Sequence, residues 1–383
     1  MAKIGFTVSD GSDLGDLLVS REIFSEGGLW NWGRDNYGQL GDNSTASKSS
    51  PVQTIAWGSN WKQVSVSEDG HTAAIKTDGT LWLWGRDSYG LLGGNTIANK
   101  SSPVQTVSGG NNWKQVSLGR FYSAAIKTDG TLWTWGRNNK GQLGDNTITD
   151  RSSPVQTVSG GNNWKQVSCG YHAAAIKTDG TLWLWGENTY GQLGDNTITD
   201  RSSPVQTISG GTNWKQVSCG YHTSAIKTDG TLWTWGNNNI GRLGDNSVTN
   251  RSSPVQTISG GTNWKQVDAG KDHTAAIKTD GTLWLWGYNI EGQLGDNSVT
   301  MKSSPIQTVS LGNNWKQVDA GSASTSAIKT DGTLWTWGNN LYGQLGDNSV
   351  TKKSSPVQTI ALGTNWKQVS IGNLHMSAVK DDM

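Results

Sequence analysis

Histidine recurs at one position of a repeated sequence block, and imidazole is a common ligand of metal ions in proteins. The five copies are His71, His172, His222, His273 and His375. Tyr122 and Ser324 occupy the same position in two further blocks, and neither replaces an imidazole ligand well. A ring of imidazoles around a central channel is one interpretation. A position that accepts any polar group beside the axis is the better one, and we predict no metal site.

Carboxylates and thiols also recur, and both can do chemistry. The repeated carboxylates are Asp78, Asp129, Asp179, Asp229, Asp280 and Asp331. Each precedes a glycine in a turn, and equivalent environments do not separate the pKa values of an acid and a base. Cys169 and Cys219 share a position that other blocks fill with Val, Leu, Ala or Ile, which favours a small buried side chain over a disulfide or metal pair. We therefore predict a protein that is not an enzyme and needs no cofactor.

The element that must position these residues is a block of about fifty residues that occurs seven times. Each block carries a Leu-Trp-x-Trp-Gly run, which begins at Leu29, Leu81, Leu132, Leu182, Leu232, Leu283 and Leu334. The chain has 22 Trp and only three Phe, so tryptophan must form most of the core. A fixed period of this kind indicates one repeat array instead of several unrelated domains.

Within one block the pattern predicts four short strands and no helix. Residues 164–169 and 172–177 are two β-like runs, and Asp179-Gly180 forms a hairpin into residues 181–185. Pro204 lies in the fourth run, and proline at a strand start suits an edge. The Ala-rich run at 173–176 is expected nearest the axis. Four strands in about fifty residues is the size of a propeller blade.

The two ends of the chain complete each other. Residues 377–382 form the first half of the hairpin, and residues 27–30 supply the second half. Pairing them removes the open edges of the array. We predict an all-β, seven-bladed β-propeller of four-stranded blades at residues 29–383, with one blade closed by the N- and C-terminal strands and a short N-terminal arm at residues 1–28.

Charge and hydropathy exclude several classes of partner. The 31 Lys and Arg nearly balance the 30 Asp and Glu, so the broad attraction that nucleic acid requires is absent. No apolar stretch is long enough to span a membrane, and residues 1–28 lack the apolar region of a signal peptide. We expect no nucleic acid and no membrane insertion.

Read loosely across the blocks, the pattern Val-x-x-Gly-x-His-x-x-Ala-Ile-x-x-Asp-Gly-x-Leu-x-x-Trp-Gly-x-Asn-x-x-Gly-Gln-Leu-Gly-Asp closely resembles the regulator of chromosome condensation repeat. The resemblance covers nearly all of residues 29–382 and implies a seven-bladed propeller. Family members include a nucleotide exchange factor, a plant ultraviolet photoreceptor and a β-lactamase inhibitor. No block carries the inserted wedge of the exchange factor. The regular alternation of Trp133 and Trp135 indicates core packing and not light sensing.

Two sets of residues are candidates for partner binding. The first lies in the loops after Trp-Gly, where the blocks differ most, and comprises Arg34, Tyr37, Arg86, Tyr89, Arg137, Lys140, Tyr190, Tyr288 and Tyr342. Exposed Tyr and Arg on a rigid ring suit recognition, although neutral drift explains the variation equally well. The second set lies in the arm, where a short helix is expected to need a partner, and comprises Phe6, Leu14, Leu17, Leu18, Ile23 and Phe24.

The near identity of the blocks, and the run Gly5-Phe6-Thr7-Val8-Ser9, resemble propellers and fibre segments of marine bacteriophage structural proteins. This resemblance implies a virion component at the tail or a fibre, made in the host cytoplasm. Its arm would bind other virion proteins, and its loops would bind a host surface receptor. The alternative is a free protein-binding propeller that acts as an inhibitor or scaffold.

Overall fold

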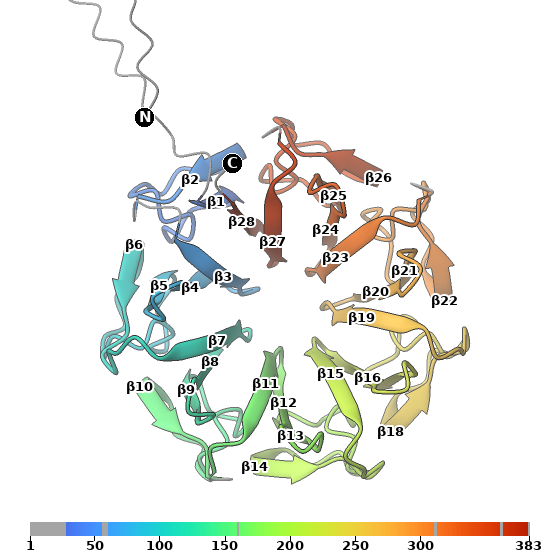
Figure 1. The fold of residues 1–383 in the computed structure, drawn as a ribbon, viewed down its shortest axis with the longest axis horizontal. Helices are drawn as coiled ribbons and strands as arrows, with labels where there is room; N and C mark the ends of the chain where they lie inside the picture. The colour runs from blue at the N-terminus through green and yellow to red at the C-terminus, as the bar shows by residue number, and fades with distance from the viewer. Residues whose placement is uncertain (1–27, 56–59, 159–160, 310–311, 361–362, 382–383) are drawn as a thin grey trace, which may run out of the picture.

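A computed structural model describes residues 28–55, 60–158, 161–309, 312–360 and 363–381. The six predicted arm residues, from Phe6 to Phe24, lie outside the described residues. The described residues form seven antiparallel four-stranded sheets arranged around one axis, as a β-propeller (Figure 1). The prediction of an all-β, seven-bladed propeller is confirmed. No helix among the described residues is of a kind that could cross a membrane.

We number the blades from 1 to 7 in chain order, with the split blade as blade 7. Blade 1 comprises β3 (Trp61–Val66), β4 (His71–Lys76), β5 (Leu81–Gly85) and β6 (Lys100–Gln105). Blade 2 comprises β7 (Trp113–Leu118), β8 (Tyr122–Lys127), β9 (Leu132–Gly136) and β10 (Arg151–Gln156). Blade 3 comprises β11 (Trp164–Cys169), β12 (His172–Lys177), β13 (Leu182–Gly186) and β14 (Arg201–Gln206). Blade 4 comprises β15 (Trp214–Cys219), β16 (His222–Lys227), β17 (Leu232–Gly236) and β18 (Arg251–Gln256). Blade 5 comprises β19 (Trp264–Ala269), β20 (His273–Lys278), β21 (Leu283–Gly287) and β22 (Lys302–Gln307). Blade 6 comprises β23 (Trp315–Ala320), β24 (Ser324–Lys329), β25 (Leu334–Gly338) and β26 (Lys353–Gln358).

Blade 7 is built from both ends of the chain, as predicted. It comprises β27 (Trp366–Ile371), β28 (His375–Lys380), β1 (Gly28–Gly33) and β2 (Lys48–Gln53). The antiparallel register between β28 and β1 places Leu29 opposite Val379 and Gly33 opposite His375. This pairing completes the sheet of blade 7 and closes the ring, so the two ends of the repeat array leave no unpaired strand edge between them.

The strand nearest the axis is not the Ala-rich one. In each blade the Trp-Lys-Gln-Val strand is innermost, and the Ala-rich strand is second (Figure 1). The innermost strands of neighbouring blades belong to separate sheets, and a glutamine side chain bridges them. The Gln166 side-chain amide donates to the carbonyl of Val217 at 3.1 Å, and its Oε1 accepts from the Val217 amide at 3.3 Å. Because this strand carries the bridging side chain, it forms the inner edge.

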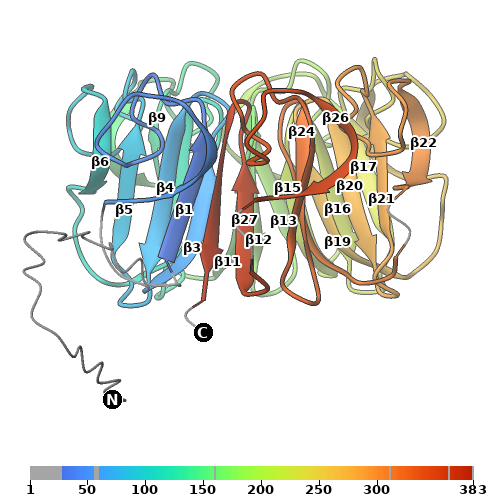
Figure 2. The ribbon, with the colours of Figure 1, turned by 90° about the horizontal axis from the view of Figure 1, so that it is seen from above.

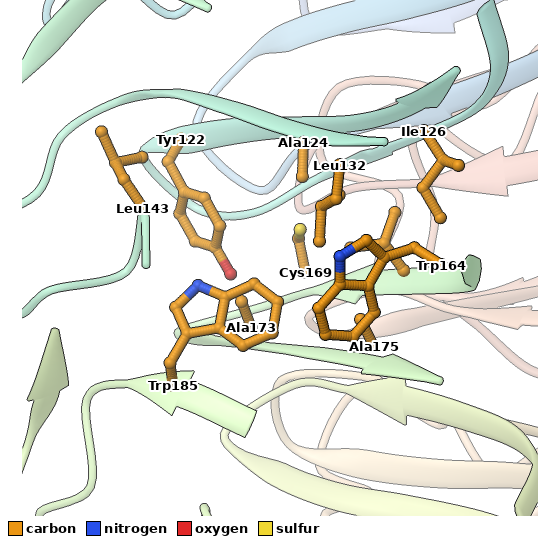
Figure 3. Packing of buried hydrophobic residues seen from close by; sticks show 11 residues of the cluster. Tyr122, Ala124, Ile126, Leu132, Leu143, Trp164, Cys169, Ala173, Ala175 and Trp185 are labelled. Atoms are coloured by element: carbon orange, nitrogen blue, oxygen red, sulfur yellow. The ribbon is translucent and has the colours of Figure 1, made fainter. Parts of the chain in front are cut away.

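The core lies between neighbouring blades. In blade 3, Trp164 and Trp185 are almost fully buried and pack with their ring centroids 6.2 Å apart. The Trp185 indole nitrogen donates to the carbonyl of Gln142 in blade 2 at 2.9 Å. Figure 3 shows this junction, with residues of β8 and β9 facing residues of β11, β12 and β13. The equivalent indole donates to the preceding blade at six of the seven junctions, so tryptophan joins blades as well as filling the core.

The proline strand is the outermost of each blade, which confirms its edge position (Figure 1). Pro204 is not at the strand start, however, but is the fourth residue of β14. The ladder with β13 is irregular between the Leu184 and Gly186 pairs, opposite this part of β14. Proline needs no ladder hydrogen bond in an irregular edge strand, so this position tolerates it.

Candidate functional site

The variable loops gather on one face of the ring, together with the short turns between the first and second strands of each blade. The Arg137 amide, in a variable loop, donates to the carbonyl of Phe121, in such a turn, at 2.9 Å. We call this the upper face. The Asp-Gly hairpins follow the other end of the second strand of each blade and so lie on the opposite, lower face. In blade 7 this end is where β28 finishes and β1 begins, with Gly28 paired with Lys380; Figure 2 shows the ring from the side.

Part of each variable loop is a structural element. Its second residue is Asp or Asn in every blade and is buried, as at Asn138. The Asn138 Oδ1 accepts from the Leu143 amide at 2.9 Å, and the equivalent bond recurs from Asp35 to Leu40. Burial raises the pKa of Asp35 to about 7. This position closes the loop and leaves the first, third and fourth residues to form the surface, the third being the most exposed.

The first and fourth residues pair across the junctions between blades. A guanidinium lies over the tyrosine ring of the preceding blade at three successive junctions, with distances to the ring centroid of 5.1 Å for Arg34 and Tyr342, 5.1 Å for Arg86 and Tyr37, and 5.2 Å for Arg137 and Tyr89. These side chains are half-buried, not fully exposed as the sequence analysis expected. Arginine and tyrosine therefore constrain each other, because the cation–π contact holds both side chains in place.

The remaining predicted loop residues do not join this series. Lys140 forms an ion pair with Asp200 at 3.0 Å. The Tyr190 amide donates to Oε1 of Gln192, and the Tyr288 amide donates to the carbonyl of Asp272. These residues lie on the same face, but no ring contact joins Tyr190 or Tyr288 to another described residue.

The sequence analysis missed the residues of the first turn, which form the centre of the upper face. Tyr171 and Tyr221 stack across the junction of blades 3 and 4 with ring centroids 3.6 Å apart. Arg120 lies between two rings, 4.6 Å from the centroid of Phe121 and 5.0 Å from that of Tyr171. The signal was present in the sequence, since the residue at this position varies among the blocks, which carry Glu68, Arg120, Tyr171, Tyr221, Lys271, Ser322 and Asn373.

These contacts form a continuous series, which we call the aromatic–cationic ladder. It runs across blades 1 to 5 and comprises Tyr89, Arg137, Phe121, Arg120, Tyr171, Tyr221, Lys271 and Arg242. Arg242 occupies a position that is glutamine in five of the other blocks and Leu91 in the sixth. It is buried and bonds to Asp272 at 2.7 Å and to the carbonyl of Lys271 at 3.0 Å. The ladder is thus anchored to blade 5 at one end.

Two carboxyl groups beside the ladder have raised pKa values. Glu68 accepts a hydrogen bond from the Tyr171 hydroxyl at 3.2 Å. Burial raises the pKa of Glu68 to about 7, although Lys271 and Arg120 oppose the shift. Burial also raises the pKa of Asp69 to about 6, against the attraction of Arg86, whose guanidinium lies 2.7 Å away. At a pH below about 7 the Glu68 carboxyl group is mostly neutral, and it then does not balance the charge of Arg120.

Two cavities open beside the ladder. One, of about 120 Å³, lies at the axial mouth and is lined by Glu68, Arg120, Lys271 and the ends of the innermost strands. The other, of about 210 Å³, lies off the axis and is lined by residues of blades 2, 3 and 4, among them Arg120, Arg137, Lys140, Glu187, Tyr171 and Tyr221. We call the second cavity the arginine pocket.

The histidines lie between blades and do not line a channel. The ring nitrogen Nε2 of His172 lies 2.6 Å from Oγ1 of Thr223, and that hydroxyl donates to the carbonyl of Gln192. The hydroxyl therefore accepts from a neutral imidazole protonated at Nε2. Burial lowers the pKa of His172 to about 3, so the ring stays neutral. Equivalent contacts join His71 to Ser123, His222 to Thr274, His273 to Thr325 and His375 to Thr72.

The two blocks without histidine face the two blocks without a hydroxyl. Tyr122 faces Ala173, and its ring points toward Ala173 and Trp185 (Figure 3). Ser324 occupies the position of His273 in the following block, and Met376 occupies the position of Thr325. Ser324 and Met376 are therefore the second pair that departs from histidine and hydroxyl. A large residue thus meets a small one at each exception, which preserves the volume of the junction. The histidine position is a packing site.

The other chemical candidates also have structural roles. Asp179 accepts from the amide and the hydroxyl of Thr181 at 2.9 and 2.7 Å, and these hydrogen bonds lower the pKa of its carboxyl group. Cys169 and Cys219 are buried free thiols whose pKa values are raised by burial, as a small core position predicts. Within the described part of the chain, no group of three or more His, Cys, Asp and Glu is placed to hold a metal ion.

The fold and the upper face define a seven-bladed β-propeller with one elaborated surface. The family model of the RCC1-like domain matches residues 20–308 and 172–383, and the chain belongs to this family. It is 31% identical over 367 residues to the ultraviolet-B receptor UVR8 of Arabidopsis thaliana, which covers 94% of this chain and 60% of the receptor. The chain therefore spans less than two thirds of that relative.

Solved structures show the same fold. Human WBSCR16 superposes with a TM-score of 0.82 at 21% identity, covering 93% of this chain and 99% of that chain. Yeast RCC1 (Prp20), solved with Kap60 bound, superposes with a TM-score of 0.81 at 18% identity, covering 99% and 97%. These comparisons confirm the resemblance to the chromosome condensation regulator repeat. They give no support to the tail or fibre role that the sequence analysis predicted.

Proposed function

We propose that this chain is a non-catalytic binding propeller that recognises another protein through its upper face and acts as a scaffold or inhibitor of that protein. The observation that carries the proposal is the aromatic–cationic ladder. It concentrates Tyr, Phe and Arg, the residue types most enriched at protein interfaces, on one side of a rigid ring.

The asymmetry of the ladder supports recognition over packing. The Gln bridges and the Trp contacts recur around the ring, as packing requires. The ladder does not recur, because it spans blades 1 to 5, and the equivalent turns of blades 6 and 7 carry Ser322 and Asn373. A surface that departs from the sevenfold pattern while the core keeps it is expected to serve a partner and not stability.

Site-specific photo-crosslinking in the native source tests the proposal. Benzoylphenylalanine would replace Asn139, an exposed residue on the upper face, or Lys165, an exposed residue near the lower hairpins. The proposal predicts a discrete crosslinked protein from position 139 and none from position 165. Crosslinking from position 165 alone would place recognition on the lower face, and no crosslink from either position would contradict a protein-binding role.

A further inference from the structure

The arginine pocket holds two guanidinium groups whose charge is not balanced by a close carboxylate. Among the described residues, Arg120 and Arg137 have no carboxylate oxygen within ion-pair distance. Three other cations of the upper face are paired, Arg86 with Asp69 at 2.7 Å, Arg242 with Asp272 at 2.7 Å and Lys140 with Asp200 at 3.0 Å, whereas Arg34 and Lys271 contact aromatic rings. The pocket lining also contains Glu187, which lies beyond ion-pair distance of both arginines.

Aromatic rings hold both guanidinium groups in position. Phe121 lies between them, with its centroid 4.6 Å from Arg120 and 5.2 Å from Arg137. Tyr171 covers the other side of Arg120, and Tyr89 contacts Arg137 at 5.2 Å. A guanidinium stacked by its face keeps the N–H groups of its edge available for a bidentate contact. Because the side chains are already ordered, little conformational entropy remains to be lost on binding.

The chemistry of the pocket selects an anionic group on a chain. Planar guanidinium groups match the geometry of a carboxylate, and a volume of about 210 Å³ admits a side chain but no folded element. Nucleic acid is disfavoured, since the whole chain carries a formal charge of only +1 and the two arginines converge on one small pocket. The flanking rings of Tyr171 and Tyr221 offer an apolar wall for the rest of a peptide.

We propose that the arginine pocket binds an aspartate or glutamate side chain of an acidic peptide segment, with Arg120 and Arg137 contacting its carboxylate. This inference rests on the proposed function and names the chemistry of the partner. It assigns to the two arginines the role of specificity residues within the upper face.

Fluorescence anisotropy with a defined peptide tests the proposal. The probe is a fluorescein-labelled twelve-residue peptide of Glu, Asp, Gly and Ser, and its control is the same peptide with Gln and Asn. We expect the full chain to bind the acidic peptide and not the amide peptide. Arg120→Gln and Arg137→Gln should each weaken binding by about tenfold, because each removes a charge-assisted hydrogen bond.

Two charge-matched variants serve as controls. Arg34→Gln removes a stacked arginine from another part of the upper face, and Lys165→Gln removes an exposed lysine from the lower side. Both should leave the affinity within about twofold of wild type, as expected for charges outside the contact. Unchanged thermal unfolding of all four variants would exclude a loss of folding as the cause.

Several results would overturn the proposal. They are absence of binding by the wild-type chain, equal binding of the amide peptide, or an equal loss in Arg34→Gln or Lys165→Gln. Tighter binding of a single-stranded RNA of the same length, competing with the peptide, would assign the pocket to phosphate. If the peptide fails to bind while position 139 still crosslinks a protein, only this inference falls. If both experiments fail, the proposed function falls with it.

Discussion

The Nε2 atom of His172 in blade 3 lies 2.6 Å from the Thr223 hydroxyl in blade 4, whereas the equivalent pair one junction earlier is Tyr122 and Ala173. The two residues of each pair lie about fifty positions apart, yet they differ together. One junction has a histidine with a hydroxyl, and the other has a tyrosine with an alanine. The two positions of a junction thus change together from blade to blade. This relationship gives the repeated histidine a structural role, as the hydrogen-bonded partner of a hydroxyl in the next blade.

The pairing predicts a compensating double substitution. His172→Tyr alone should destabilise the protein by about 1 to 3 kcal/mol, because the phenol would collide with Thr223 in a filled junction. Adding Thr223→Ala recreates the Tyr122–Ala173 pair and should recover most of the loss. Thermal unfolding of both single variants and the double variant measures the coupling. Additive losses in the double variant would show that the two positions are independent.

Substitution of the two tryptophans of one strand should have unequal effects. Trp185 is fully buried and donates to the Gln142 carbonyl, whereas Trp183 is half-buried and donates to the Thr181 hydroxyl. Trp185→Phe should cost about 2 to 4 kcal/mol, since it leaves a cavity and removes the donor of a buried carbonyl. Trp183→Phe, the matched control, should cost about 1 kcal/mol or less. Chemical denaturation compares them, and equal losses would contradict the assigned core.

The raised pKa of Glu68 predicts a pH-dependent effect of its neutral isostere. The folded-state pKa is about 7 against an ordinary value of 4.5, so the unfolded chain releases this proton first and stability falls as the pH rises from about 4.5 to 7. Glu68→Gln should therefore raise the melting temperature at pH 8 and leave it nearly unchanged at pH 4.5. Melting curves of both proteins at the two pH values test this. A greater gain at the lower pH would show that burial does not raise this pKa.

Local patterns were sufficient to predict the repeat, the strands, the hairpins and the closure of blade 7. Trp183 and Trp185 alternate in a strand, and the Asp179-Gly180 turn is a local signal, so neighbours in sequence carry the information. The order of strands about the axis was predicted wrongly. Alanine is small enough for the inner position, but Gln166 provides the hydrogen bonds that the inner edge needs.

The upper face could be predicted only in part. The loop residues Arg137 and Tyr89 were identified singly, because the loops after Trp-Gly vary among the blocks. Their pairing, and the stack of Tyr171 on Tyr221, arise between blades about fifty residues apart. A pattern within one block carries no information on contacts of this kind.

The measurement that tests the central claim most directly is hydrogen–deuterium exchange of the chain with and without the protein crosslinked at position 139. If the upper face is the recognition surface, the partner will slow exchange in residues 118–123, 169–172 and 219–222. The lower hairpins at residues 127–131 and 177–181 will be unchanged. Protection confined to the lower hairpins, with the upper turns unaffected, would contradict the account.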